Sequence, residues 1–259
     1  MTSLKSALAL SLLTLLGSMP AQADLAVAGH STVVVLGMQG VGQEAVWLSK
    51  TRLRRDLIDR GRAYTHLFDL DTKEVTIIDH AMRQADVQRL TDLDTNAAAQ
   101  VSAKEIKLDI KPTGRKRPLQ KWQCAEHQMQ LTMPVEVGGD KLEFNLSGTA
   151  WLARNTAEQP ETATFVKATR TPDFFLSVPA LARASPVYAR GLSEAIRRIA
   201  PLGLVCSLDV DLRYEGTGRM AELSRKLASH LSVEYDRYET SPIPEGAFVI
   251  PAGYRIQHR

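Results

Sequence analysis

The sequence has no apolar run long enough to cross a bilayer, few aromatic residues and almost no net charge. A membrane-spanning helix needs about 20 consecutive apolar residues, and the longest apolar stretch here, Ala7–Leu16, falls well short of that length. Aromatic residues make up 6% of the chain and the formal net charge is +3. This balance excludes the strongly basic proteins that bind nucleic acid through charge alone. We therefore expect no transmembrane segment in the mature chain and no nucleic-acid partner.

The N-terminus has the pattern of an export signal. Lys5 precedes the apolar stretch, and the breakers Gly17 and Pro20 lead to the small-x-small ending Ala21-Gln22-Ala23. This order of a basic region, an apolar region and an A-x-A site is typical of a cleaved secretion signal. We expect residues 1–23 to be removed after Ala23, leaving residues 24–259 as a single domain in the periplasm.

Cysteine is scarce, and histidine is dispersed. Cys124 and Cys206 are the two cysteines, and in an oxidising compartment they can form a disulfide or stay as two separate buried thiols. None of the six histidines lies three or four residues from another, so there is no local histidine pair of the kind that binds zinc. The sequence predicts no metal site, no cofactor and no catalytic residue set.

Most of the mature chain has the two-residue alternation of β-strands. Ile106, Leu108 and Ile110 alternate with charged residues, as in a half-buried strand. Hairpins are predicted for Ala63–Leu70 with Glu74–Asp79 and for Trp122–Val137 with Lys141–Arg154. Leu204–Tyr214 alternates in the same way, whereas Pro112 to Pro118 is expected to be a basic turn and Val87–Lys104 a helix or loop.

The region between residues 172 and 200 has a different pattern. Leu192, Ile196 and Ile199 recur at helical spacing, and Pro172 with Asp173 is typical of a helix start. Consecutive hairpins interrupted by a few helices predict an α+β fold with one large, curved antiparallel sheet. Helices from this region are expected to cover the concave face of the sheet.

Two segments carry a resemblance to a known family. Val46–Arg83 has the basic stretch Lys50–Asp56 followed by a hairpin ending in Ile77-Ile78-Asp79, and the chain closes on Phe248–Tyr254 with the order Phe-x-x-Pro-x-Gly-Tyr. These features resemble a family of bacterial secreted proteins of unknown function that is similar to the periplasmic lipoprotein-carrier (LolA-like) superfamily. The resemblance implies a half-barrel sheet with helices in its mouth and an apolar cavity for acyl chains.

The candidate binding residues are of two kinds. An apolar group is expected to form either a lid over such a cavity or ordinary core: Phe174, Phe175, Val178 and Leu181. A basic group is expected at the cavity rim, at a partner or simply in solvent: Arg52, Arg54, Arg115, Lys116 and Arg117. If residues 52–55 form a strand, Arg52 and Arg54 share one face and Arg55 takes the other.

Three functions remain open on the sequence alone. The first is a non-enzymatic periplasmic protein that binds the acyl chains of a lipid or lipoprotein. The second is an envelope protein-interaction or sensing module without a small ligand. The third is a nucleotide-binding enzyme, because Gly37–Ala45 contains Gly-x-Gly-x-x-Ala after a predicted strand. That loop would need a helix to follow it, and Gln43–Ile58 can be drawn as an amphipathic one.

Overall fold

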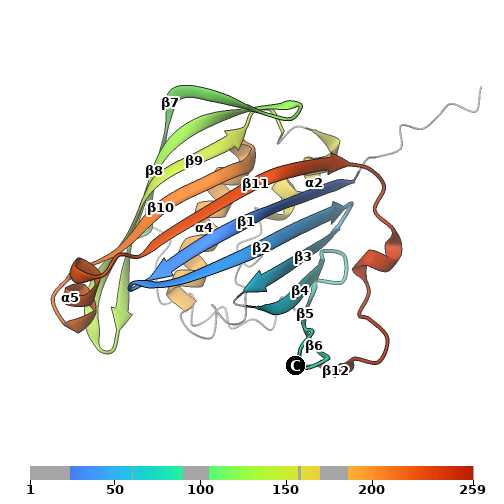
Figure 1. Cartoon of the computed structure of the whole chain (residues 1–259), viewed down its shortest axis with the longest axis horizontal. Coiled ribbons are helices and arrows are strands. Elements are labelled where there is room, and N and C mark those ends of the chain that lie inside the picture. The colour runs from blue at the N-terminus through green and yellow to red at the C-terminus, as the bar shows by residue number, and fades with distance from the viewer. Residues whose placement is uncertain (1–23, 60, 90–104, 157–158, 170–185, 259) are drawn as a thin grey trace, which may run out of the picture.

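The chain forms one twelve-stranded, largely antiparallel sheet with a few short helices (Figure 1). The computed structural model describes residues 24–59, 61–89, 105–156, 159–169 and 186–258. The strand order is β12-β6-β5-β4-β3-β2-β1-β11-β10-β9-β8-β7. The expected antiparallel sheet is confirmed, and strands account for far more of the described chain than helices do.

The strands follow the predicted alternation closely. They are β1 Leu25–Val35, β2 Met38–Ser49, β3 Arg52–Asp59, β4 Arg62–Asp69, β5 Glu74–Asp79, β6 Gln84–Arg89, β7 Lys107–Leu119, β8 Trp122–Val137, β9 Asp140–Ala153, β10 Leu204–Gly216, β11 His230–Thr240 and β12 Arg255–His258. Both predicted hairpins are confirmed as β4–β5 and β8–β9. The predicted strand at Leu204–Tyr214 is β10.

The helices are short, and two of them lie against the same face of the sheet. They are α2 Pro160–Thr169, α4 Pro186–Ile199 and α5 Arg219–Lys226, with 3-10 turns η2 Ala200–Leu202 and η3 Glu245–Phe248. The sheet twists and curves around α2 and α4, whereas α5 caps one end (Figure 1). We call the surface toward α2 and α4 the helix face and the opposite surface the outer face.

Strand register assigns residues to the helix face. Ile199 of α4 packs with Val210, and Val210 pairs with Leu231 in β11. Leu231 pairs in turn with Val33 of β1, and Val33 pairs with Gly40 of β2. Because side chains alternate along a strand, every second residue from these positions faces the helices.

The half of the helix face formed by β7–β10 is apolar and filled. Ala195 of α4 packs among Leu131, Met133 and Phe144, all of which are buried. At Gly191 a β-carbon would lie 2.2 Å from the Met133 sulfur, so the helix approaches β8 closely through a residue without a side chain. This half of the face is ordinary core.

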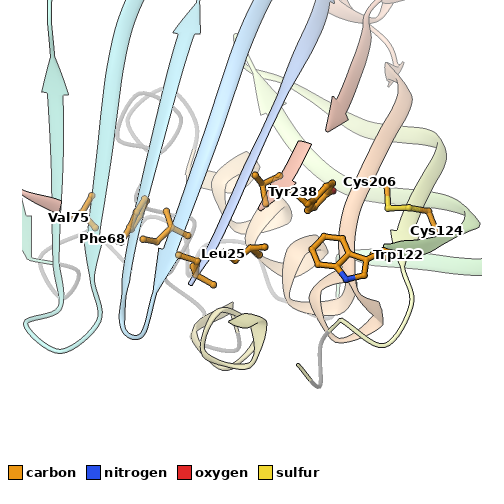
Figure 2. Close-up of a cluster of buried hydrophobic side chains, with 11 residues drawn as sticks. Leu25, Phe68, Val75, Trp122, Cys124, Cys206 and Tyr238 are labelled. Atoms are coloured by element: carbon orange, nitrogen blue, oxygen red, sulfur yellow. A yellow bond between two sulfur atoms is a disulfide. The ribbon is translucent and has the colours of Figure 1, made fainter. Parts of the chain in front are cut away.

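Cys124 and Cys206 are joined by a disulfide. Both are fully buried, and they connect β8 to β10 across β9 beside Trp122 and Tyr238, whose ring centroids are 4.5 Å apart (Figure 2). The bond joins residues 82 positions apart, and closing a loop of that size stabilises a fold by about 4.5 kcal/mol in the chain-entropy estimate. A buried disulfide is consistent with an oxidising, extracytoplasmic compartment.

The C-terminal segment lies on the outer face of β3–β6. Ile250 and Tyr254 pack against a small buried cluster of Leu67, Ile78 and Ala85. The Tyr254 hydroxyl lies 2.9 Å from Nδ1 of His80, and β12 then pairs in parallel with β6. The closing Phe-x-x-Pro-x-Gly-Tyr segment therefore packs on the outer face of the β4–β5 hairpin. These are the two segments that carry the family resemblance.

Three local predictions were wrong. Pro112 to Pro118 is not a turn but part of β7, with an irregular register between Pro112 and Lys116. As the last strand at one edge of the sheet, β7 can hold prolines without losing ladder hydrogen bonds on its free side. Gln43–Ile58 is the β2–β3 hairpin and not a helix, and Val87–Arg89, at the start of the stretch expected to be a helix or loop, belong to β6.

Candidate binding site on the helix face

Several predicted site residues are not placed on the helix face. Phe174, Phe175, Val178 and Leu181 lie outside the described residues. As predicted for a strand, Arg52 and Arg54 share one face of β3, but it is the outer face, where they contact the C-terminal segment. Nη1 of Arg54 donates to the Ala247 carbonyl (2.7 Å), and the Arg52 guanidinium lies 4.9 Å from the Phe248 ring centroid.

The second basic group lies far from the first, on edge strand β7. Arg115 forms a double hydrogen bond with the buried carboxylate of Glu126. The Thr113 hydroxyl, which also donates to this carboxylate, and Arg115 hold its pKa low although burial alone would raise it. Arg117 lies 4.8 Å from the Trp151 ring centroid and donates to Ser207. Lys116 is exposed. The five basic residues therefore form no common rim.

A charged row that the sequence analysis did not assign as a site crosses the helix face at β1, β2 and β11. Glu44, Gly29 and Tyr235 are paired in register on three neighbouring strands. The Tyr235 hydroxyl donates to Oε1 of Glu44 over 2.6 Å, so its side chain reaches across β1 at the one position that has no side chain. A β-carbon at Gly29 would lie 2.2 Å from the Glu234 carbonyl oxygen, which makes glycine necessary here.

A bulge in β11 brings the tyrosine into this row. The register shifts between Ala28 and Gly29, so that Tyr238 pairs with Val27 while Tyr235, three residues earlier, pairs with Gly29. Both tyrosines therefore face the helices, which regular alternation would forbid. Burial and the nearby Glu44 carboxylate raise the pKa of Tyr235 well above its usual value, so the hydroxyl stays a proton donor.

Arg55 balances the charge of Glu44. Its Nη2 lies 2.6 Å from Oε2 of Glu44, and the two side chains are 34% and 12% exposed. Burial alone would raise the pKa of Glu44, but the charge and hydrogen bond of Arg55, with the Tyr235 hydroxyl, outweigh it and hold that pKa below its usual range. Glu44 also raises the pKa of Arg55, against the effect of burial. The pair is therefore ionised on both sides.

His66 adjoins this pair on β4. It is the cross-strand neighbour of Arg55 and is 7% exposed. Burial, and after it the positive charge of Arg55, lowers the pKa of His66 to about 4, so the ring is neutral at neutral pH. Nδ1 of His66 has no hydrogen-bond partner among the described residues, which is an unusual state for a buried ring nitrogen.

An open pocket of about 450 Å³ begins at the Glu44–Arg55 pair. Most of its lining is helix-face positions of the first three strands: Ser31, Val33, Val35, Met38, Gly40, Gly42, Glu44, Arg55 and Leu57. Gly40 and Gly42 contribute backbone alone to the floor of the pocket along β2, and a β-carbon at Gly42 would lie 2.7 Å from the Ser31 hydroxyl. Glycine inside a strand often marks a place where another group approaches the backbone closely.

The arrangement joins an apolar trough to a polar end. Val33, Val35 and Leu57 supply the apolar walls, and the ionised pair with its tyrosine donor closes the trough at the other end. Volumes of this size are typical of small-molecule sites. Such a trough suits a molecule with a hydrocarbon chain and a polar head.

The sequence contains a signal for this site in the glycines of Gly37–Ala45. Gly37 forms the β1–β2 turn with a positive φ of 79°, and Gly40 and Gly42 lie within β2. The segment thus consists of the turn and the first part of β2, and it does not lead into the helix N-terminus that a nucleotide loop needs. The pairing of Glu44 with Tyr235, 191 residues apart, has no local signal.

Comparisons with known proteins give no family. No family model matches the chain, and no curated protein matches it. A solved structure of PNGF-II in the C2 space group is similar over 91% of this chain and 31% of that chain, with 9% sequence identity and a TM-score of 0.36. The chain thus spans about a third of the length of that protein, and a likeness of this degree carries no argument about function.

The described residues show neither a helix suited to crossing a membrane nor a metal-binding cluster. No helix in the described ranges combines the length and apolarity needed for a span. Within these same ranges, no group of three or more histidine, cysteine, aspartate or glutamate side chains is placed to hold a metal ion.

Proposed function

We propose that this chain is a non-enzymatic periplasmic protein that binds the acyl chain of a lipid or lipoprotein. The observation that carries the proposal is the trough over Gly40 and Gly42, a pocket of about 450 Å³ on a sheet face that buried apolar side chains fill elsewhere in the described chain. We assign it the LolA-like half-barrel architecture that the sequence resembles. The proposed lid of Phe174, Phe175, Val178 and Leu181 belongs to the same proposal.

Hydrocarbon burial supplies the binding free energy in this proposal. Each methylene group transferred from water contributes about 0.8 kcal/mol. Association costs at least about 4 kcal/mol in lost freedom of motion, so short chains bind weakly and only chains of roughly ten or more carbons are retained. The ligand class is therefore long-chain amphiphiles.

The polar end selects the orientation of the ligand. Arg55 is one-third exposed and a guanidinium can hold more than one acceptor, so a headgroup oxygen can join Glu44 on it. The buried Nδ1 of His66 lies on the neighbouring strand. We propose that the headgroup lies at Arg55 and that the chain runs along Gly42 and Gly40 toward the β1–β2 turn.

The experiment is solvent extraction and mass spectrometry of residues 24–259 purified from the periplasm without detergent. The proposal predicts one long-chain lipid in near-stoichiometric amount. A Leu57→Trp variant fills the trough and should reduce that yield severalfold, whereas Leu202→Trp, at an exposed position, should not. A clean extract from folded wild-type protein would overturn acyl-chain binding and favour the protein-interaction module.

A further inference from the structure

The end of the sheet that contains the β1–β2 turn has an unusual surface. Among the described residues nine large apolar side chains are strongly exposed, and four of them lie here: Val35 and Met38 on the helix face, Val41 on the outer face of β2, and Leu227 directly after α5. Met38 is 71% exposed and Val41 62%. We call these four residues the tip. Exposed apolar side chains that gather in one place mark an interaction surface, whereas scattered ones do not.

The tip is held together by contacts between distant parts of the chain. The amide of Gly37 donates to the Ala228 carbonyl (3.0 Å), and the amide of Leu36 donates to the Ser229 hydroxyl (2.9 Å). A β-carbon at Gly37 would lie 3.8 Å from the Leu227 side chain. The turn and the end of α5 therefore present one rigid surface, and they lie side by side at the same end of the sheet (Figure 1).

Positive charge adjoins the tip. The eight residues of α5 include Arg219, Arg225 and Lys226 against the single carboxylate Glu222. Arg225 and Lys226 immediately precede Leu227 and are exposed, and Arg225 donates to the Gly216 carbonyl. With Arg213 they line a depression that also contains Asp211 and Glu215, so cations outnumber carboxylates there. Apolar side chains flanked by exposed cations match the interface of an anionic bilayer, where the apolar groups enter the acyl boundary and the cations meet phosphate.

The pocket opens at the tip. Val35 and Met38 belong both to the tip and to the lining of the trough, at the end opposite Glu44 and Arg55. A hydrocarbon chain that passes between a bilayer and the trough would avoid water only if the mouth of the trough touched the bilayer. The geometry points to the tip as a docking surface for the anionic face of a phospholipid bilayer, from which the acyl chain is exchanged; the exchange step rests on the proposed function.

Vesicle flotation tests the docking surface directly. The mature chain should float with vesicles of phosphatidylcholine plus phosphatidylglycerol and bind vesicles of phosphatidylcholine alone at least roughly tenfold more weakly. High salt should remove most of the difference, because it screens the charges on α5. Equal binding to both vesicles, no binding to either, or binding only when membrane protein is present would overturn the proposal.

Matched variants localise the effect. Val41→Glu should weaken binding to the anionic vesicles roughly tenfold, since it places a carboxylate among the inserted side chains. Lys226→Gln should weaken it roughly fivefold. The control Met82→Glu makes the same kind of change at an exposed methionine in the β5–β6 turn and should have no effect. A loss of equal size in the control and the tip variants would contradict the assignment.

One further variant separates docking from acyl-chain binding. Leu57 lines the trough but lies outside the tip. Leu57→Trp should therefore keep vesicle binding while losing the extracted lipid. A wild-type protein that yields no lipid but still floats would overturn the proposed function alone, whereas one that yields lipid but does not float would overturn docking alone.

Discussion

The two halves of the helix face are built differently although they belong to one continuous sheet. Over β8–β10 the face carries Met133, Phe144 and other buried apolar side chains, and α4 packs directly on them through Gly191 and Ala195. Over β1–β5 a second buried cluster that includes Leu25, Leu48, Leu53 and Phe68 fills part of the face, and only the end of β1–β3 toward the β1–β2 turn holds Glu44 and Arg55 with Gly40 and Gly42. A buried ion pair contributes little net stability compared with an apolar core, so the filled parts of the face supply stability and the end of β1–β3 beside the turn supplies the site.

The largest expected contrast concerns truncation of apolar side chains. Phe144→Ala leaves a cavity in close-packed core and should lower the free energy of unfolding by about 3–5 kcal/mol. Leu57→Ala should cost only about 1 kcal/mol, because Leu57 already borders open space. Urea unfolding of both variants checks the contrast, and equal losses would mean that the trough is core.

The next contrast concerns ion pairs. Arg55→Met leaves the carboxylate of Glu44 buried without its partner and should cost about 2–4 kcal/mol, reduced from the fully buried value because Arg55 is one-third exposed. Lys111→Met breaks an exposed pair with Asp109 on β7 and should cost less than about 0.5 kcal/mol. The same unfolding assay distinguishes them, and a near-neutral Arg55→Met would show that water reaches Glu44 freely.

The pH dependence of stability provides a third contrast. The pKa of His66 is about 4 in the fold and near 6.5 in the unfolded chain, so the unfolded state binds more protons between these values. Stability should be complete above about pH 6.5 and fall by about 3 kcal/mol as the pH drops to 4. The lowered pKa of Glu44 adds a further loss only below about pH 4.5, its ordinary value.

Two histidine variants test whether His66 causes the loss of stability between pH 6.5 and 4. His66→Gln should flatten the stability profile between pH 6.5 and 4, measured by unfolding at a series of pH values. His127→Gln, on β8 in the apolar half, should leave the slope unchanged. A slope that persists in His66→Gln would show that another group titrates in this range.

Local sequence patterns predict the strands well and the site poorly. The alternation within Leu204–Tyr214 is enough to predict β10, since burial on one face of a strand has a period of two. The same logic correctly separated Arg54 from Arg55 on opposite faces of β3. It could not say which face would meet α4, and so the predicted rim residue Arg54 lies on the outer face.

The site depends on contacts between distant residues. Tyr235 reaches Glu44 only because a bulge in β11 shifts the register and because Gly29 leaves a gap in β1, and neither feature has a sequence signature of its own. The glycines of β2 were visible, but a Gly-x-Gly-x-x-Ala pattern has the same appearance in a nucleotide loop and in a strand. The sequence does not decide whether Cys124 and Cys206 form a disulfide, because it does not give the distance between their Cα atoms, which is 6.5 Å here.

Photolabelling with a long-chain fatty acid that carries a diazirine near its methyl end tests the division of the helix face most directly. The delipidated mature chain is irradiated with the probe, digested and mapped by mass spectrometry. Labels should concentrate on peptides from residues 31–58, which contain Val33, Met38 and Leu57, and Leu57→Trp should remove them. Labels concentrated on residues 122–153, or spread evenly over both halves, would contradict the assignment of the site to β1–β3.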